Sequence, residues 1–469
     1  MMAFGKGFRF MNHFVRRQAL AQRPASVALL VGAALAAGLL AQPCAAQDGL
    51  ALKLTSWLAS AQVQGMPLMA AQPLTFEELI AAVEDSHPAL RTARVQARAA
   101  EQDVDSVDRQ RWPSLSVVME SASGGGGTVV PSRLFRVEHT LWDFGRIKNL
   151  RAESREQVNI AQTNVAISRQ ELLLQALNVW QQLVGGVERE RVARKALVQL
   201  VDYREQMQRR VEANASAAID LALAEARVLQ AQADLAQARS VVLQATARLE
   251  QLSGLPHLGV RVRDVQLAPL MRPVDAMAQQ LRQVDLTTVA SESPTVQRAA
   301  YEHSVLQKRL EVKAAEQNPQ VYFRLDKPLD SASGSGSTSP RYYVGLRYSP
   351  SAGGAGYSEV KALATRLEGQ ELAADTALRE VLQALSTDRE EFISARNRLD
   401  GLERSAAGAK DVLASYQRQF EAARKSWLDL LNSVREVSGS EYALAEARVA
   451  MLGAMWRLQL RMGQPLGAQ

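Results

Sequence analysis

The second half of the chain repeats the first, and this duplication limits the fold more than any other feature. A shift of 209 positions aligns residues 220–254 with residues 429–463, and 12 of the 35 aligned pairs are identical. The identical pairs include Asp220 with Asp429 and Gly254 with Gly463. A repeat of this length is a duplicated domain rather than a solenoid unit, so we expect the function to use both copies.

Upstream of these residues the two halves share the order of their expected helices and strands, but few identical residues. A shift of 206 aligns Pro88 with Pro294 and Pro113 with Pro319. Each half then shows a helix, a strand hairpin, a very long helix, a turn and a long helix. We therefore expect repeat 1 at 74–254 and repeat 2 at 285–463. An N-terminal linker (47–73), an inter-repeat linker (255–284) and a C-terminal tail (464–469) complete the expected division.

The first 46 residues are typical of a secretory signal peptide. They hold five basic residues and no acidic one, an apolar run at 25–41, and small residues at Cys44, Ala45 and Ala46. This order predicts cleavage near Ala46. A membrane anchor is one alternative, although the run of mostly Ala and Gly is at the short limit for crossing a bilayer. A lipidated Cys44 is the other.

Without that segment the chain is nearly neutral and has no cysteine. The full chain has 55 Lys and Arg residues and 49 Asp and Glu residues, and five of the basic residues lie in the signal peptide. The near balance that remains argues against a nucleic-acid partner. The lack of cysteine excludes a disulfide framework and a thiol nucleophile from the mature chain.

Two very long helical patterns dominate each repeat. From Arg146 to Val211 there is no proline, and apolar residues recur at spacings of three and four. A helix over 146–213 would be about 100 Å long, which is too long for a compact globule. Its partner at 218–252 is rich in Ala, which lets helices approach closely as in a coiled coil. The second repeat predicts the same pair at 357–422 and 427–461.

The segments at about 113–142 and 319–349 change to a period of two. Apolar residues alternate with polar ones on both arms of each hairpin, as in the strands of a transmembrane barrel. In the first hairpin Leu115, Val117 and Met119 alternate with Ser114, Ser116 and Val118, and the return arm places Phe135, Val137, His139 and Leu141 on one face. Aromatic residues near the strand ends, which suit a membrane interface, include Trp112, Trp142, Tyr342 and Tyr348.

Four strands per chain cannot close a barrel, and an open sheet edge cannot face lipid. The membrane interpretation therefore requires an oligomer. A dimer would give eight strands with a filled interior, whereas a trimer would give twelve strands and a lumen. A conduit favours the trimer.

From about Leu74 to Gly463 the chain resembles the TolC-type outer-membrane factors, which are exit ducts of bacterial efflux and type I secretion. The resemblance is carried by LTFEELIAAVEDSHPAL (74–90), RWPSL (111–115), TLWDFGR (140–146) and LEQLSG (249–254), in this order and within a duplication. It implies a mainly α fold with a small β part. It also implies a homotrimer in the outer membrane of a Gram-negative bacterium, whose 12-stranded β-barrel continues into an α-helical periplasmic tunnel.

The same resemblance implies a constriction where the long helices turn. The stretch FEAARKSWLDLLN (420–432) matches the lining segment of the family. Asp429 matches an acidic ring by its spacing from Phe420, and Asn432 stands where the family has a second ring. Lys425, Asp220 and Phe420 match positions of a gate latch. Converging carboxylates would raise one another's pKa and favour cations. Helix capping is the alternative for Asp220 and Asp429.

No pattern for catalysis, a metal or a cofactor is present in the sequence. His87, His139, His257 and His303 stand far apart without ligand spacing. Gly124–Gly127 lacks the Lys-Ser/Thr of a phosphate-binding loop. We expect no enzyme and no cofactor, and therefore expect the energy for transport to come from a partner.

The expected function is a passive channel that an inner-membrane transporter reaches through a periplasmic adaptor protein. KSWLDLLNSVRE (425–436) resembles variants paired with exporters of large adhesins or toxins. Type I protein secretion with an ABC exporter is therefore preferred to a proton-driven pump. Efflux of small molecules, drugs or metals is the alternative within the class. A periplasmic adaptor or structural coiled-coil protein is the alternative from another class.

Overall fold

The computed structural model describes residues 75–123, 129–261, 265, 267–329, 339–349, 352–422 and 424–464. The expected signal peptide (1–46) with Cys44 and the N-terminal linker (47–73) lie outside these residues, as does nearly all of the C-terminal tail. The described part is mainly helical with one small sheet, as predicted. None of its helices has a stretch long and apolar enough to cross a membrane.

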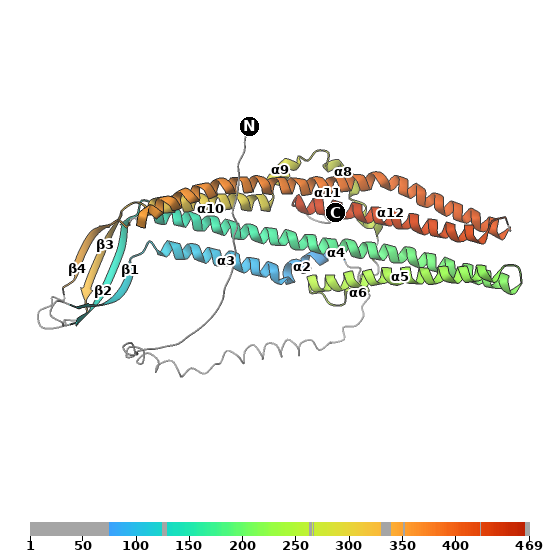
Figure 1. Cartoon of the computed structure of the whole chain (residues 1–469), viewed down its shortest axis with the longest axis horizontal. Coiled ribbons are helices and arrows are strands. Elements are labelled where there is room, and N and C mark those ends of the chain that lie inside the picture. Colours follow the sequence, from blue (N-terminus) through green and yellow to red (C-terminus); the bar gives the residue numbers. More distant parts are fainter. Residues whose placement is uncertain are drawn as a thin grey trace, which may run out of the picture. The chain divides into compact units, whose positions relative to one another are not determined.

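The two repeats contain matching elements (Figure 1). Repeat 1 comprises α2 (Phe76–Ser86), α3 (Pro88–Arg109), β1 (Ser114–Ser123), β2 (Val129–Trp142), α4 (Arg146–Glu212) and α5 (Ala218–Ser253). Three short helices follow in the inter-repeat linker, α6 (Leu258–Arg261), α7 (Leu267–Leu270) and α8 (Val274–Gln280), and α9 (Leu286–Ser291) begins repeat 2. Repeat 2 comprises α10 (Pro294–Glu316), β3 (Gln320–Pro328), β4 (Arg341–Arg347), the 3-10 turn η2 (Ala352–Gly354), α11 (Ala355–Glu421) and α12 (Trp427–Arg461).

The longest helices, α4 and α11, begin at equivalent glycines. Both helices have 67 residues, so each extends about 100 Å. Gly145 and Gly354 precede them with φ of 84° and 74°, a left-handed conformation that glycine adopts without steric cost. The Asp143 carboxylate accepts hydrogen bonds from the backbone N–H groups of Gly145 (3.1 Å) and Ile147 (2.8 Å). These contacts explain why the TLWDFGR segment starts a helix.

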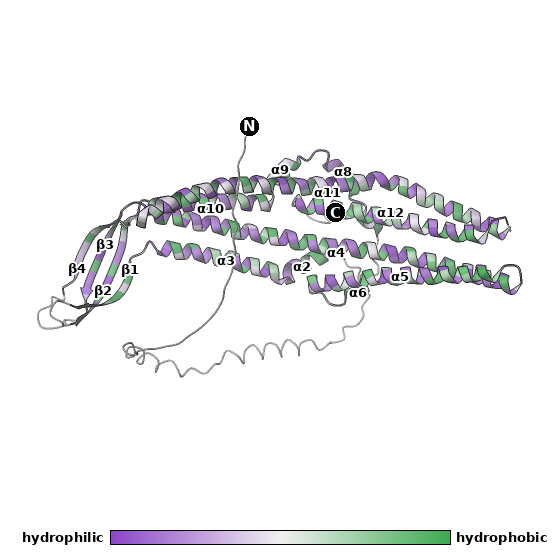
Figure 2. Cartoon of the chain, viewed as in Figure 1, coloured by the Kyte–Doolittle hydropathy of each residue, from purple (hydrophilic) through white to green (hydrophobic). Residues whose placement is uncertain are grey.

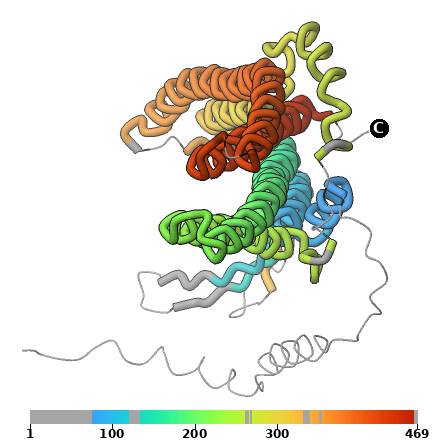
Figure 3. The backbone as a smooth tube through the Cα atoms, turned by 90° about the vertical axis from the view of Figure 1, so that its right-hand side faces the viewer, coloured from blue at the N-terminus to red at the C-terminus, as the bar shows by residue number. Residues whose placement is uncertain are grey.

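The long helices lie side by side in a row. In the half of the helices farther from the sheet, the order of neighbours is α5, α4, α12, α11 (Figure 3). In the half nearer the sheet, α3 and α10 lie on either side of α4, and α11 lies beside α10. The packing of α5 follows a heptad, because its buried residues recur at alternating spacings of four and three. They are Ala224, Val228, Ala231, Leu235, Ala238, Ala245 and Leu249. This pattern produces the coiled-coil packing that the Ala-rich sequence predicted.

A buried group of charges joins α11 to α12, and we call it the Asp388 network. Arg457 donates to Asp388 at 2.7 Å and to Glu391 at 2.6 Å, and it reaches Gln181 of α4 at 3.3 Å. Arg461 donates to the second oxygen of Asp388 at 2.9 Å. The Asp388 side chain is only 8% exposed. Because each donor lies one turn from the other on α12, the network fixes the register of the two helices.

The four strands form one antiparallel sheet in the order β1-β2-β3-β4. The hairpins of the two repeats therefore join through β2 and β3. The register aligns like with like across all four strands: Leu115, Val137, Leu325 and Tyr342 form one row. The next row on the opposite face is Ser116, Arg136, Asp326 and Arg341. One face is consequently mainly apolar and the other mainly polar.

Candidate gate and membrane-facing sheet

The two helical turns lie at the end of the long helices that is farthest from the sheet. A separate core, the tip cluster, holds them together with Tyr203 of α4, Phe420 of α11 and Trp427 of α12. The Trp427 ring lies edge-on to Tyr203, with centroids 6.0 Å apart, and packs on Phe420 at 5.3 Å. The Arg210 guanidinium lies 4.7 Å from the centre of the Phe420 ring. Residues of both repeats therefore pack at the tip.

Hydrogen bonds also cross between the repeats in the tip cluster. The Trp427 indole N–H donates to the backbone carbonyl of Asp220 at 3.1 Å. The Tyr203 hydroxyl donates to the Gln417 side chain at 3.4 Å. Burial raises the pKa of Tyr203, and nearby carboxylates add to the rise, so this hydroxyl keeps its proton. These two bonds connect the first-repeat helical hairpin to the second.

Ser426 caps the start of α12, and Asp429 in the first turn bonds to it twice. The Ser426 hydroxyl accepts from the Asp429 N–H at 3.1 Å and donates to its carboxylate at 2.8 Å. Lys425 lies 3.5 Å from the same oxygen, and its ammonium is 4.4 Å from the centre of the Tyr416 ring. The Ser426 hydrogen bond first, and then the charge of Lys425, lower the pKa of Asp429. The side chain remains 43% exposed, which leaves it accessible to ions.

The remaining predicted gate residues lie in the same region. Asn432 is half-buried on α12, one turn after Asp429. Phe420 is 7% exposed and belongs to the core of the tip rather than to its surface. Within this chain Lys425 pairs with Asp429, whereas Asp220 is reached at its main-chain oxygen by Trp427.

Sequence reasoning did not single out Trp427 or Tyr203. A signal was present, because Ser426 and Asp429 have the spacing of a capping box, which places Trp427 in the first turn of α12. A tryptophan at a helix start between two turns is a candidate for contact with the neighbouring hairpin. The acceptor, a backbone carbonyl, leaves no mark in the sequence.

The apolar face of the sheet is widely exposed in this chain. Leu115, Val117 and Met119 of β1 are 68%, 61% and 71% exposed, and Val344 and Leu346 of β4 are 73% and 66% exposed. Figure 2 shows the hydrophobic and hydrophilic residues along these strands. A contiguous apolar surface of this kind marks contact with lipid or with another protein.

The four predicted interface aromatics are also exposed. Trp112 is 75% exposed, Trp142 61%, Tyr342 67% and Tyr348 56%. A bulge between Thr140 and Trp142 places Trp142 opposite Val321, so its ring joins the apolar face. Trp112, Trp142 and Tyr348 lie where the strands meet the helices, while Tyr342 lies near the opposite end of β4.

Ion pairs hold the polar face of the sheet. Arg136 forms a bidentate contact with Asp326 at 2.8 and 3.3 Å, and Arg324 approaches the same carboxylate at 3.5 Å. Arg347 donates to Glu138 at 2.8 Å. The Arg136–Asp326 and Arg347–Glu138 pairs join different strands, whereas Arg324 and Asp326 are neighbours on β3. The ion pairs therefore help to hold the strands together.

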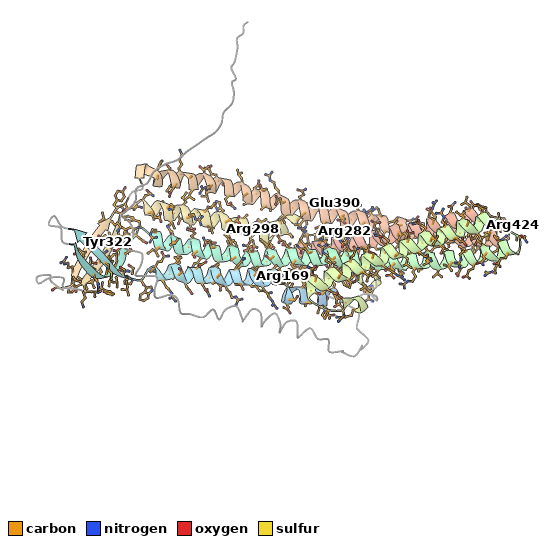
Figure 4. All side chains as sticks on the ribbon, turned by 60° about the horizontal axis from the view of Figure 1, so that its bottom comes forward. Arg169, Arg282, Arg298, Tyr322, Glu390 and Arg424 are labelled. Carbon is orange, nitrogen blue, oxygen red and sulfur yellow. The ribbon has the colours of Figure 1, made fainter. Side chains whose placement is uncertain are left out.

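Tyr322, which Figure 4 labels on the sheet, pairs with Gly345 of β4, and its ring lies over that glycine. A Cβ at Gly345 would come within 2.6 Å of the Tyr322 ring, so any other residue there would force the ring to move. The Arg347 guanidinium lies 4.7 Å from the centre of the same ring. Figure 4 also labels Arg424 at the turn between α11 and α12, at the other end of the helices.

Metal ligands do not gather anywhere in the part of the chain that the structure describes: no group of three His, Cys, Asp or Glu side chains could hold an ion. His87 caps the start of α3, His139 lies on β2, His257 lies in the linker and His303 lies on α10. The four histidines thus belong to different elements.

Solved structures with this fold include several bacterial membrane proteins. A membrane protein from Pseudomonas aeruginosa has a TM-score of 0.70 at 17% identity, covering 84% of this chain and 92% of that one. The outer membrane protein VceC from Vibrio cholerae has a TM-score of 0.70 at 13% identity, covering 82% and 95%. The open state of the MtrE outer membrane channel from Neisseria gonorrhoeae has a TM-score of 0.66 at 17% identity, covering 83% and 88%.

The sequence matches no protein-family profile and no curated protein sequence. At identities of 13–17% the likeness shows the fold. The chain therefore shares its fold, over most of its length, with outer-membrane channels.

Proposed function

We propose that this chain is the subunit of a passive trimeric channel in the outer membrane, an exit duct for a transporter of the inner membrane. The observation that carries the proposal is the sheet, with one exposed apolar face and one ion-paired polar face. It stands at the end of helices about 100 Å long. Alternating lipid-facing and lumen-facing residues are what a transmembrane strand requires. The fold shared with MtrE and VceC supports the same function.

The open edges of the sheet favour a closed oligomer. β1 and β4 each have a neighbour on one side only, and unpaired backbone groups are costly in lipid. Pairing β1 of one copy with β4 of the next satisfies both edges, and three copies give a twelve-stranded barrel with a lumen. The helix row would close in the same way, with α5 of one copy beside α11 of the next.

The tip is proposed as the gate. Trp427, which bonds to Asp220, ties the second-repeat hairpin to the first, and Phe420 packs beneath it. Asp429 would form an acidic ring at the constriction with Asn432 one turn along, and Lys425 would act as the latch that neutralises Asp429 while the gate is shut. The MtrE channel has been solved in an open state, which supports a movable gate in this fold.

The transported cargo is proposed from the 425–436 segment alone. Its resemblance to secretion variants favours type I export of a large adhesin or toxin, with an ABC exporter and a periplasmic adaptor as partners. Small-molecule efflux through a proton-driven pump is the second candidate. The solved structures of similar fold are channels such as MtrE, and they do not separate these candidates.

The test is copurification from mildly crosslinked cells of the native organism, with mass spectrometry of the captured proteins. An ATP-binding exporter held with a large secreted protein would support type I secretion, whereas a proton-driven pump would move the proposal to efflux. Washing membranes with salt is the matching control. Release of the protein into the salt wash would contradict the channel itself.

A further inference from the structure

Three arginines surround one carboxylate on the polar face of the sheet. The register places Arg136 and Arg341 on either side of Asp326, and Arg324 lies two residues before it on β3. The Asp326 side chain is 9% exposed. Arginine stays protonated in proteins, so one carboxylate neutralises only one of the three guanidinium groups. This arginine cluster (Arg136, Arg324 and Arg341) therefore has an excess of positive charge.

Arg136 occupies both oxygens of the Asp326 carboxylate. One guanidinium nitrogen donates to the first oxygen at 2.8 Å and another donates to the second at 3.3 Å. Bidentate contacts of this kind are among the strong ones that arginine forms with a carboxylate. Arg324 approaches the second oxygen only at 3.5 Å, and its buried Nε has no hydrogen-bond partner among the described residues. Arg324 thus keeps donors that Asp326 does not satisfy.

Arg324 does not pair with Glu138, the second carboxylate of the described polar face. Glu138 is the register partner of Arg324 on β2, but it accepts a hydrogen bond from Arg347 at 2.8 Å. The Arg324 guanidinium lies instead over the Tyr343 ring of β4, 4.7 Å from its centre. An aromatic face holds a cation in place without neutralising it. Tyr343 therefore positions the charge of Arg324 on the β4 side of the cluster.

Arg341 is the most exposed member of the cluster. Within the part of the chain that the structure describes, it forms no ion pair and no hydrogen bond. Arg341 pairs with Asp326 and Tyr343 pairs with Arg324, so the two arginines are diagonal neighbours on β3 and β4. Diagonal positions on paired strands are about 7–8 Å apart, within reach of long side chains. The two guanidinium groups can therefore contact one small anionic group together.

We infer that Arg324 and Arg341 form a binding site for carboxylate groups of molecules in the channel lumen. The inference rests on the proposed channel function, which turns the polar face of the sheet toward the lumen. The contact between Arg136 and Asp326 shows that the cluster already holds one carboxylate. A second carboxylate, from the lumen, would take up the donors that Asp326 leaves open. Planar carboxylates match the fork of a guanidinium group.

The site lies toward the loop end of the sheet, because Arg341 is the first residue of β4. With the long helices in the periplasm, as proposed, this end is the outer mouth of the channel. A carboxylate that is added from outside reaches the arginine cluster without passing the tip. Binding can therefore be measured whether the gate is open or shut.

The test measures citrate binding to the full mature protein, purified as the assembled channel in detergent, by isothermal titration calorimetry. The wild type should bind citrate at low ionic strength and lose affinity as salt rises. R341Q and R324Q should each weaken binding roughly tenfold, the loss expected for one hydrogen bond to a charged group. R341K should retain part of the affinity, since lysine keeps the charge but not the fork. D326N should strengthen binding, because it removes the carboxylate that competes for the arginines.

Lys327→Gln is the matched control. Lys327 follows Asp326 on β3, but it lies on the apolar face in the row of Phe135. K327Q should leave citrate binding unchanged, and an equal loss in K327Q and R341Q would overturn the inference, since net charge alone would then explain the binding. Tighter binding of pyrophosphate, a phosphate anion of similar charge, would overturn the assignment to carboxylates.

Unchanged citrate binding in R341Q would also overturn the inference. That result is expected if a carboxylate of the next copy neutralises Arg341 in the assembled barrel. Glu120, which continues the polar face of β1 by register, would then be the partner.

A salt wash of membranes separates this inference from the proposed function. Release of the protein by salt would contradict the channel, whatever the affinity for citrate. A protein that stays in the outer membrane and assembles there without binding citrate would contradict the carboxylate site only.

Discussion

The Asp429 carboxylate at the tip stabilises the start of α12 and is also the candidate for an ion-binding ring. Asp429 bonds to the helix cap Ser426 through its N–H and through its carboxylate, and the same side chain is the candidate for an acidic ring. The two roles make opposite demands. Capping and Lys425 lower its pKa, whereas three converging carboxylates would raise it. Lys425 therefore decides how much charge the ring keeps.

We predict that the Asp429 ring binds cations at neutral pH and loses them only in acid. Its lowered pKa means that its favourable interactions are present above the usual value of 3.8 and are lost as pH falls through the lower value in the folded protein. Asp429→Asn should abolish block by divalent cations in planar bilayers. Lys425→Ala should move the pH midpoint of the block upward. An unchanged block in Asp429→Asn would remove this residue from the gate.

Trp427 offers a second prediction at the residue scale. Trp427→Phe keeps an aromatic ring in the tip cluster but removes the N–H that bonds to Asp220. We expect more frequent opening in single-channel recordings. Trp427→Ala should in addition cost about 3–5 kcal/mol of stability, because the ring is 5% exposed.

Trp180→Phe is the control for that experiment. Trp180 is 1% exposed, and its indole N–H has no hydrogen-bond partner among the described residues. Replacing Trp180 with Phe also removes an indole N–H, but it breaks no hydrogen bond and the site lies far from the tip. If Trp180→Phe opened the channel as often as Trp427→Phe, the bond to Asp220 would not be the tie.

At this scale the sequence could predict that Asp429, Lys425, Phe420 and Asp220 lie at the tip, but not the role of Trp427 and Tyr203 or how these residues pair. Asp429, Lys425 and Asp220 come close because the duplication places both turns at the same distance from the sheet. The tie to a backbone oxygen depends on the relative rotation of two hairpins, and packing rather than residue type determines it.

Among the elements, the joint between α11 and α12 carries the most buried charge. Removing one partner of a buried ion pair leaves an uncompensated charge and costs about 3–5 kcal/mol. Arg457 is 15% exposed and holds both Asp388 and Glu391, so we predict a loss near this size for Arg457→Ala in urea unfolding. Without Arg457, Asp388 keeps the guanidinium of Arg461 as a partner.

Arg248→Ala provides the matched control, because Arg248 is the equivalent of Arg457 in repeat 1. It is exposed on α5, and its counterpart of Asp388 is Val179. A surface change of this kind usually alters stability by less than about 0.5 kcal/mol. Equal effects of the two substitutions would show that the Asp388 network does not stabilise the joint.

The elements themselves were largely predictable. Proline-free apolar spacing predicted the long helices, and alternation predicted the hairpins. The pairing of β2 with β3 was not predictable from local pattern, because 177 residues separate Trp142 from Gln320 at their helix-side ends. The packing of α4 against α10 places these strands side by side.

For the whole molecule, the lack of cysteine after residue 44 makes a crosslinking test direct. We predict that a variant with Leu115→Cys on β1 and Val344→Cys on β4, treated with a short bis-maleimide, forms a ladder that ends at three copies. Each substitution alone should give no ladder, because in a ring of identical copies β1 of one copy faces β4 of the next and never another β1. A single variant that crosslinks to itself would indicate a twofold dimer instead.

Duplication has a consequence for symmetry. A doubled chain around a threefold axis presents six similar hairpins, so the tip would approximate a hexagon. The Asp388 network occurs in one repeat only, since the equivalent positions are Val179, Arg248 and Leu252. Three helical hairpins that contain the Asp388 network would then alternate around the axis with three that lack it. If the tip opens, it would therefore widen with threefold rather than sixfold symmetry, because the three hairpins with the Asp388 network are stiffer than the three without it.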